Sequence, residues 1–321
     1  MKISIFTGCV IPIKYPGMEA AARFLAPRLD IELVDVKFGC CPAPLGLKAV
    51  HFDAWLALAA RNLCLTEEKG LDVVTLCAGC TNTLRETNHI LAQDEKKRLF
   101  VHDMLRRQGK QYQGSMHIYH LPDLLAQEPI LERIESERVR PLKGLKVGTH
   151  YGCHYYRPSA VMNDDHRDSA HPLPETMEVI LETLGAEIVE YNRAELCCGA
   201  ALNINAGRNA ESLQVLREKL DWMNEAGLDA LAVACPACFT QFDTGQLLLC
   251  RRDPARRTIP AFHIAELVAY ALGAEPEAMQ LSAHKIKGEA VLAAIAAAVT
   301  PAAVSEAPAA AAVVPPGSVG V

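Results

Sequence analysis

The sequence of 321 residues has no excess of positive charge and no long apolar run. Its formal net charge of −6 argues against a nucleic-acid-binding protein, because such proteins usually present a basic surface to phosphates. No stretch reaches the roughly 20 apolar residues that cross a bilayer. The N-terminal residues are too few and too mixed for the apolar region of a signal peptide. We therefore expect a cytoplasmic protein without a direct membrane span.

A glycine-rich dinucleotide fingerprint and an obvious flavin site are also missing. Electrons for any redox chemistry would therefore come from a partner protein. Cysteine, in contrast, is abundant, with 12 residues in the chain. Without an export signal, so many cysteines indicate metal or redox chemistry rather than a disulfide framework.

Ten of the cysteines form one series that occurs twice. The first series is Cys9, Cys40-Cys41 and Cys77-x-x-Cys80, and the second is Cys153, Cys197-Cys198 and Cys235-x-x-Cys238. The gaps between these groups are 30 and 35 residues in the first series and 43 and 36 in the second. Duplication explains two such series better than coincidence. Cys64 and Cys250 lie outside both and are expected to be buried structural thiols.

Apolar runs of strand length alternate with segments of helix length in both halves. Strands are predicted over 2–6, 31–36 and 72–76, and again over 145–150, 186–191 and 229–234. This alternation indicates an α/β protein with two similar Rossmann-like domains, each containing a parallel sheet with cysteines at the carboxyl ends of its strands. The predicted domains are 1–130 and 145–275, joined by a linker over 131–144 and followed by a disordered Ala/Pro-rich tail over 276–321.

The cysteines of each half are expected to converge, because the carboxyl ends of parallel strands share one edge of the sheet. Five thiolates exceed the four that a zinc ion or a cubane cluster takes. Neighbouring side chains in extended chain also point to opposite sides, so an adjacent pair suits two iron atoms better than one ion. The residues therefore predict a polynuclear iron–sulfur centre in each half, with zinc in one half as the alternative.

The doubled series resembles the duplicated cysteine-rich CCG domain, and over about residues 1–275 the chain resembles the B subunit of heterodisulfide reductase. This resemblance implies a noncubane 4Fe–4S cluster in each half, with all ten cysteines of the two series as ligands. It implies reduction of a disulfide, either the coenzyme M–coenzyme B heterodisulfide or a related small-molecule or protein disulfide. It also implies two partners from the same complex, the iron–sulfur C subunit together with the flavoprotein A subunit. Pro42 departs from the motif, which has glycine there.

For the catalytic role the candidates are Cys9, Cys80, Cys153 and Cys238, with a cleft between the two halves. His154, next to Cys153, is the candidate that delivers a proton or a hydrogen bond. His150 is a weaker candidate, for which packing near the cluster is the favoured interpretation.

Two other parts of the sequence have open roles. The equivalent residues His120 and His263 are expected to cap the helices that follow them rather than to take part in catalysis. The segment 155–174 either shapes the substrate cleft or forms a solvated loop. Its polar residues include Arg157, Asp164, Asp165, His166, Arg167 and His171.

Two other functions fit the same residues. One is an electron-relay CCG subunit of a succinate, fumarate, glycolate or lactate oxidoreductase. The other is a zinc-stabilised scaffold without a redox role. Iron and sulfide content distinguishes the scaffold from the two redox functions, and turnover with a disulfide distinguishes those two from each other.

Overall fold

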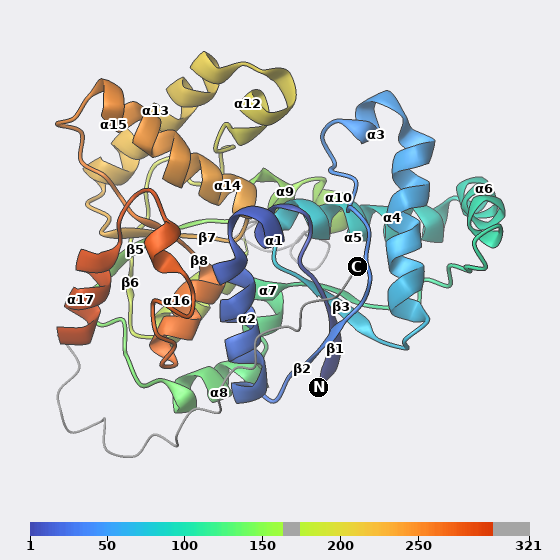
Figure 1. Ribbon diagram of the computed structural model, residues 1–321, viewed down its shortest axis with the longest axis horizontal. Coiled ribbons are helices and arrows are strands. Elements are labelled where there is room, and N and C mark those ends of the chain that lie inside the picture. Colours follow the sequence, from blue (N-terminus) through green and yellow to red (C-terminus); the bar gives the residue numbers. More distant parts are fainter. Residues whose placement is uncertain (163–173, 298–321) are drawn as a thin grey trace, which may run out of the picture.

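The chain forms two α/β units, each containing a four-stranded parallel sheet (Figure 1). The computed structural model describes residues 1–162 and 174–297. The first sheet has the order β2 (Glu32–Asp35), β1 (Lys2–Phe6), β3 (Asp72–Thr75) and β4 (Ile118–His120). The second has the order β6 (Glu187–Ile188), β5 (Lys146–His150), β7 (Ala230–Val233) and β8 (Ala261–His263). The matching order confirms the two similar domains predicted from the repeat.

The central strands are apolar along most of their length because both of their faces are covered. All four residues of β7 are buried, as are the last four residues of β1 and of β5. Burial on both faces gives continuous apolar runs rather than alternation, which is why these strands are visible in the sequence. The structure adds β4 and β8, which were not predicted, because three residues are too few for a periodic signal.

The helices that follow these strands are named in chain order. Those of the first unit are α1 (Val10–Lys14), α2 (Pro16–Arg28), α3 (Leu47–Val50), α4 (Phe52–Glu67), α5 (Ala78–Gln93), α6 (Glu95–Arg106), α7 (Leu121–Leu125) and α8 (Glu128–Glu137). Those of the second are α9 (Cys153–Tyr156), α10 (Ser159–Met162), α11 (Thr176–Thr183), α12 (Ala200–Ala206), α13 (Asn209–Glu225), α14 (Pro236–Thr240), the π-helix η2 (Gln241–Gly245), α15 (Gln246–Arg252), α16 (Ile264–Ala271), the 3-10 helix η3 (Leu281–Ala283) and α17 (Glu289–Ala297).

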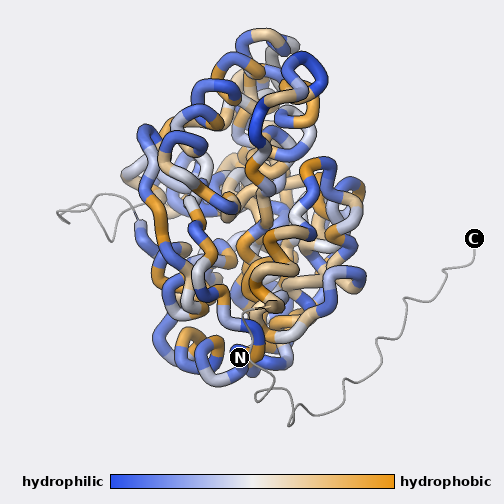
Figure 2. The backbone as a smooth tube through the Cα atoms, turned by 90° about the vertical axis from the view of Figure 1, so that its left-hand side faces the viewer, coloured by the Kyte–Doolittle hydropathy of each residue, from blue (hydrophilic) through white to orange (hydrophobic). Residues whose placement is uncertain are grey.

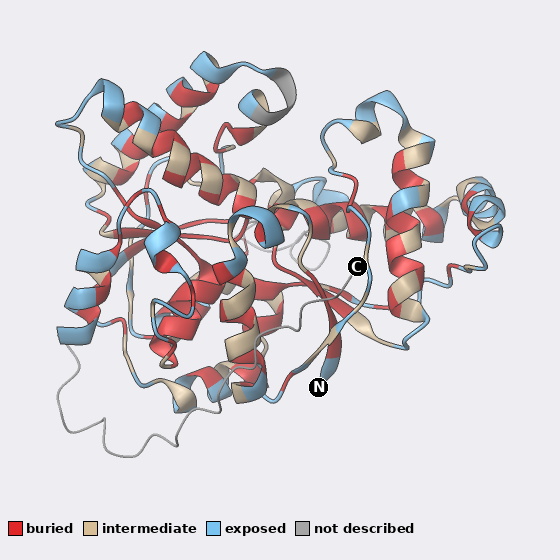
Figure 3. Ribbon diagram, in the orientation of Figure 1, coloured by how far each residue is buried: buried red, intermediate tan, exposed pale blue. Residues whose placement is uncertain are grey.

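The two units share one hydrophobic core. Helix α2 of the first unit packs against α16 of the second, and the two lie side by side at the centre of the molecule (Figure 1). Helix α11 packs in the same way against α7 and α8. The core formed by these contacts is continuous from Leu25 to Leu267, and the buried residues follow it through the centre (Figure 3). Hydrophilic segments lie mostly at the periphery (Figure 2). The units are therefore fixed against each other by apolar packing.

The structure differs from the expected linker and tail. Helix α8 extends into the predicted linker, and its Ile134 is fully buried. Within the predicted tail, η3 and α17 pack on the second unit, and Leu292 and Ile295 of α17 are buried. The hydroxyl of Tyr270 donates to the carbonyl oxygen of Leu292 at 2.9 Å. A few buried apolar residues hold these segments, although their composition is biased toward alanine or charge.

Residues 298–321 of the predicted tail lie outside the described residues, as do Asp164, Asp165, His166, Arg167 and His171 of the charged segment. Among the described helices, none combines the length and the apolar character needed to span a bilayer.

Candidate metal centres

The Cys-x-x-Cys motif of each half stands at the start of a helix that follows the third strand. Cys77 is the N-cap residue of α5, with φ −142° and ψ 122°, and Cys235 is the N-cap residue of α14, with φ −143° and ψ 125°. Cys80 and Cys238 then lie buried in the first turn. Free backbone N–H groups at a helix start favour the negative charge of a metal-bound thiolate. Contacts with neighbouring thiols lower the pKa of Cys235 and raise those of Cys77, Cys80 and Cys238.

A glycine before the first cysteine of each half leaves space for sulfur. Gly8 has φ +70° and Gly152 has φ +87°, a backbone conformation that side chains other than glycine rarely adopt. A Cβ atom would lie 3.0 Å from the Sγ of Cys80 at the first position and 3.0 Å from the Sγ of Cys238 at the second. Both halves thus leave the same space beside the second cysteine of the motif.

The two sets of cysteines open into one cavity of about 250 Å³ between the units. The series cysteines that line it are Cys9, Cys41, Cys77, Cys80, Cys153, Cys197, Cys198, Cys235 and Cys238. The two motifs approach each other there, with 3.9 Å between the Sγ atoms of Cys77 and Cys235. The cavity therefore brings nearly all of the predicted ligands from both halves to one place.

The thiols of the second half are close together without forming disulfides. The Sγ atoms of Cys198 and Cys238 are 3.3 Å apart, and those of Cys153 and Cys197 are 4.0 Å apart. Both distances exceed the roughly 2.05 Å of an S–S bond. The backbone N–H of Gly199 donates to the Sγ of Cys197 at 3.4 Å. Hydrogen bonds from the Cys153 and Cys198 thiols lower the pKa of Cys197 to about 2, which favours a thiolate.

Cys40 is the one predicted ligand outside the lining of the cavity. It is exposed, whereas Cys41 is buried and lines the cavity, as expected for neighbours that point to different sides. Hydrogen bonds from Cys40 and then Cys80 hold the pKa of Cys41 well below its usual range. Asn62 of α4 fixes this loop, because its amide donates to the Cys40 carbonyl at 2.9 Å and accepts from the Gly39 N–H at 2.9 Å.

Two histidines lie next to the cysteines of the second half. His154 lines the cavity, and its Nδ1 atom is 3.8 Å from the Sγ of Cys153. Burial lowers the pKa of His154. His150 is fully buried, and a ring nitrogen of it lies within 4.8 Å of the Sγ atoms of both Cys198 and Cys238. His150 therefore lies directly beside the thiols of the second half.

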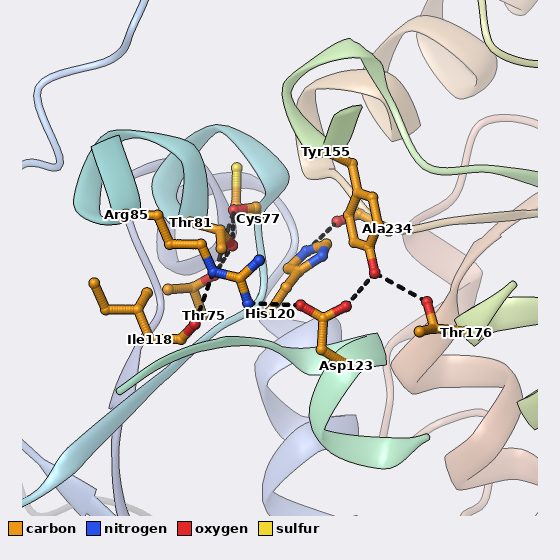
Figure 4. Close-up of polar contacts among 10 residues, drawn as sticks. All are labelled: Thr75, Cys77, Thr81, Arg85, Ile118, His120, Asp123, Tyr155, Thr176 and Ala234. Carbon is orange, nitrogen blue, oxygen red and sulfur yellow. Dashed lines mark hydrogen bonds and ion pairs between the residues drawn. The ribbon is translucent and has the colours of Figure 1, made fainter. Parts of the chain in front are cut away.

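His120 and His263 join the two units in a reciprocal way. The Nε2 of His120 is 2.9 Å from the carbonyl oxygen of Ala234, and the Nε2 of His263 is 3.0 Å from that of Leu76 (Figure 4 shows the first contact). Each of these carbonyls belongs to the residue directly before the other half's Cys-x-x-Cys motif. The predicted capping role is present in His263, whose Nδ1 accepts from the Ala265 N–H, and absent in His120.

A polar network continues this connection beside His120 (Figure 4). Arg85 of α5 pairs with Asp123 of α7 at 2.8 Å, and Asp123 also accepts a hydrogen bond from the Tyr155 hydroxyl of α9. The Tyr155 hydroxyl lies 2.9 Å from the Thr176 hydroxyl of α11. Asp123 could be found in the sequence because it lies three residues after the repeated histidine, and the second half has an acidic residue, Glu266, at the equivalent position.

The donor set and the space fit iron–sulfur clusters. Clusters are held by cysteine sulfur atoms, and here nine cysteines surround one cavity beside helix N-termini, with lowered pKa values at Cys41 and Cys197. The two cysteines outside the series lie elsewhere. Cys64 is fully buried, as expected, whereas Cys250 is partly exposed.

Comparison with known proteins agrees with this geometry. The family model for the cysteine-rich domain CCG matches residues 3–85 and 147–243, one copy in each unit. The chain is 35% identical over 295 residues to the B subunit of the ferredoxin/F(420)H(2)-dependent CoB-CoM heterodisulfide reductase of Methanosarcina acetivorans, covering 92% of this chain and 97% of that protein. The chain belongs to the family of heterodisulfide reductase B subunits. It is thus an iron–sulfur protein with a redox role, as the sequence resemblance predicted.

Members of the wider CCG group serve other complexes. The chain is 27% identical to the 8-methylmenaquinol:fumarate reductase membrane anchor subunit of Wolinella succinogenes, covering 89% of this chain and 97% of that protein. A crystal structure of a hypothetical protein from Helicobacter pylori shares the fold, with a TM-score of 0.71 at 13% identity, over 89% of this chain and 52% of that chain. The family of heterodisulfide reductase B subunits is therefore one branch of a group with a common fold.

Proposed function

We propose that this chain is the disulfide-reducing subunit of a heterodisulfide reductase-type complex. Its substrate is the coenzyme M–coenzyme B heterodisulfide or a related sulfur compound. The observation that carries this proposal is the single cavity lined by cysteines of both halves, with the Cys77 and Cys235 sulfur atoms 3.9 Å apart. Centres formed by these two sets of cysteines face each other, so one substrate between them would touch both halves at once.

Each half holds one noncubane 4Fe–4S cluster in this proposal. The ligands of the first centre are Cys9, Cys40, Cys41, Cys77 and Cys80, and those of the second centre are Cys153, Cys197, Cys198, Cys235 and Cys238. When bound, iron–sulfur clusters supply electrons one at a time, so two of them deliver the pair that an S–S bond requires. Cys40 is exposed, so its side chain has to turn toward the cavity when the first centre forms.

The overall reaction adds two electrons and two protons to an S–S bond and releases two thiols. The side chains that face the cavity position the substrate, and Cys9, Cys80, Cys153 and Cys238 are the candidates for contact with it. His154 lines the cavity beside Cys153, where its ring N–H donates a hydrogen bond to a sulfur of the substrate, and both protons come from water. Burial lowers the pKa of His154, so the ring is neutral near pH 7 and acts as a hydrogen-bond donor rather than as an acid.

The electrons come from two partners in the cell interior, the iron–sulfur C subunit together with the flavoprotein A subunit of the same complex. The named relatives, which are subunits of reductase complexes, support such partners. The similarity to the membrane anchor of a fumarate reductase supports a second candidate function, in which the chain relays electrons without reducing a disulfide itself.

The test is turnover by anaerobically purified, cluster-loaded protein with reduced methyl viologen as electron donor. We expect roughly eight iron atoms per chain, as two 4Fe–4S clusters contain, and donor oxidation that depends on the coenzyme M–coenzyme B heterodisulfide. Replacing Cys153 with alanine should abolish turnover and remove iron, whereas Cys250→Ser should preserve both. Iron-loaded protein that turns over no disulfide would favour the relay, and zinc with almost no iron would contradict both functions.

A further inference from the structure

The two halves differ at one buried position beside the cysteines. Phe6 ends β1 and His150 ends β5, and each stands three residues before the first cysteine of its half. Their partners in the sheets are also equivalent, because Phe6 pairs with Thr75 and His150 with Val233, two residues before each Cys-x-x-Cys motif. Phe6 and His150 are both 1% exposed. The same place in the fold thus holds a hydrocarbon ring in one half and an imidazole in the other.

Neither ring nitrogen of His150 makes a hydrogen bond of normal geometry among the described residues, although the Ala194 backbone lies near enough to act on the ring. Buried polar atoms in folded proteins nearly always have a partner, so this ring needs one. The Phe242 ring holds it edge-on, with 5.0 Å between the centroids and 74° between the planes. The sulfur atoms of Cys198 and Cys238 lie within 4.8 Å of a ring nitrogen, so the partner is expected on the side where the second centre forms.

The second half also buries a cation near its thiols. Lys219 of α13 is 1% exposed, and its Nζ donates to the carbonyl oxygens of Arg193 at 2.9 Å and Ala194 at 3.4 Å, in the loop that leads to Cys197. Burial lowers the pKa of Lys219 to about 8, while the nearby charge of Cys198 acts in the opposite direction. Lys219 therefore keeps its charge near pH 7.

The corresponding anchor of the first half is neutral. There the amide of Asn62 holds the loop that leads to the cysteine pair. Asn62 lies on the helix before the third strand of its half, and Lys219 lies on the equivalent helix of the second half. The first half therefore places an apolar ring and a neutral amide where the second half places an N–H donor and a positive charge.

We propose that the second centre has a higher reduction potential than the first, because His150 donates a hydrogen bond to one of its sulfur atoms and Lys219 places a positive charge behind it. Reduction adds negative charge to a cluster, and both a donor and a cation stabilise that charge. The second centre is therefore reduced first and holds the first electron until the second one arrives. This inference rests on the proposed binding of one cluster per half, but on neither the identity of the disulfide nor its turnover.

The test is a redox titration of the full-length, cluster-loaded protein without substrate, followed by electron paramagnetic resonance. Two midpoint potentials are expected. His150→Phe reproduces the first half and should lower only the higher potential, with the iron content unchanged. Lys219→Met should lower the same potential, and His150→Gln, which keeps an N–H donor, should lower it less than His150→Phe. Phe6→His should raise the other potential, and Cys250→Ser should change neither.

Three outcomes would overturn the inference. The first is a single potential for both centres, and the second is an unchanged higher potential in His150→Phe. The third is loss of iron from the second centre in that variant, which would make His150 a ligand rather than a donor. Failure of the proposed function alone would give a different result, namely two separate potentials in a protein that reduces no disulfide.

Discussion

Gly8 and Gly152 combine a positive φ with a missing side chain, and both features leave space for a cluster. At both positions the positive φ excludes most side chains, and the missing Cβ is what leaves room for the sulfur of Cys80 or Cys238. Gly227 has a similar φ of +78°, but no atom lies within 4 Å of where its Cβ would be. Gly152 and Gly227 therefore separate the cost of backbone strain from the loss of space beside a thiol.

We predict that Gly152→Ala lowers both stability and iron content. With φ 87° and ψ 150°, Gly152 lies in a backbone region almost exclusive to glycine, which costs an alanine roughly 1–3 kcal/mol, and the methyl group displaces the Sγ of Cys238 from the second centre. Gly227→Ala should lose some stability, because of its positive φ, and no iron. The measurements are urea unfolding and iron per chain in anaerobic preparations of both variants. Equal iron content in the two would show that Gly152 is not needed for cluster binding.

The sequence predicted the cysteines more fully than the residues around them. Cysteines at three strand ends converge because parallel sheets bring those ends together, which follows from local pattern alone. Asn62 and Lys219 were not predicted, because each reaches its loop from the middle of a helix that only tertiary packing places there. His150 was assigned to packing, because its sequence position shows that it ends a strand but not that its nitrogens lack partners.

At the scale of elements, the short strands β4 and β8 connect each half to the cysteine motif of the other. Each ends in a histidine that bonds to the backbone before the opposite motif, so each sheet fixes the start of the helix that carries the other half's cysteines. The repeated His-containing segments were visible in the sequence as equivalent. Their contact with the opposite half was not, because it spans 114 residues for His120 and 187 for His263.

We predict that His120 makes stability depend on pH below about 6.5. Burial lowers the pKa of His120 to about 4 in the folded chain, whereas an unperturbed histidine has a pKa near 6.5. Between these values the unfolded chain binds a proton that the folded chain does not, so stability falls as the pH falls through this range. From pH 7.5 to 5.5 the contribution is about 1 kcal/mol.

His120→Gln should remove this increment, because glutamine does not titrate, while its amide still donates to the Ala234 carbonyl. The free energy of unfolding is measured in urea at both pH values for the wild type and the variant. His117→Gln is the control, since His117 is exposed directly before β4. An identical pH dependence in the wild type and His120→Gln would show that the buried ring does not contribute.

The whole molecule is held together by a core that neither half completes alone. Helices α2 and α16 bury their apolar faces against each other, and the Arg85–Asp123–Tyr155–Thr176 network spans the same boundary (Figure 4). The cavity with its cysteines lies on this boundary, so its shape depends on both halves being folded. A duplicated domain thus became one structural unit at the place where the cysteines of both halves meet.

This shared core predicts that the two halves unfold together. The chain has 2 tryptophans, one in each half. Trp55 is fully buried in the smaller core on the outer side of the first sheet, with Phe6 and Val73, whereas Ile3 and Ile5 of the same sheet face the shared core. Separation of the units would expose Ile3 and Ile5, and the weakened sheet would no longer support the layer around Trp55.

In a Trp222→Phe variant, Trp55 fluorescence reports this outer layer of the first half alone, while far-UV circular dichroism reports the whole chain. We expect the two urea unfolding curves, recorded under anaerobic conditions, to have the same midpoint and slope, as coincident transitions require. A fluorescence change at lower urea than the loss of circular dichroism would mean that the first half opens by itself. The geometry of the cavity would then be a property of each half and not of the pair.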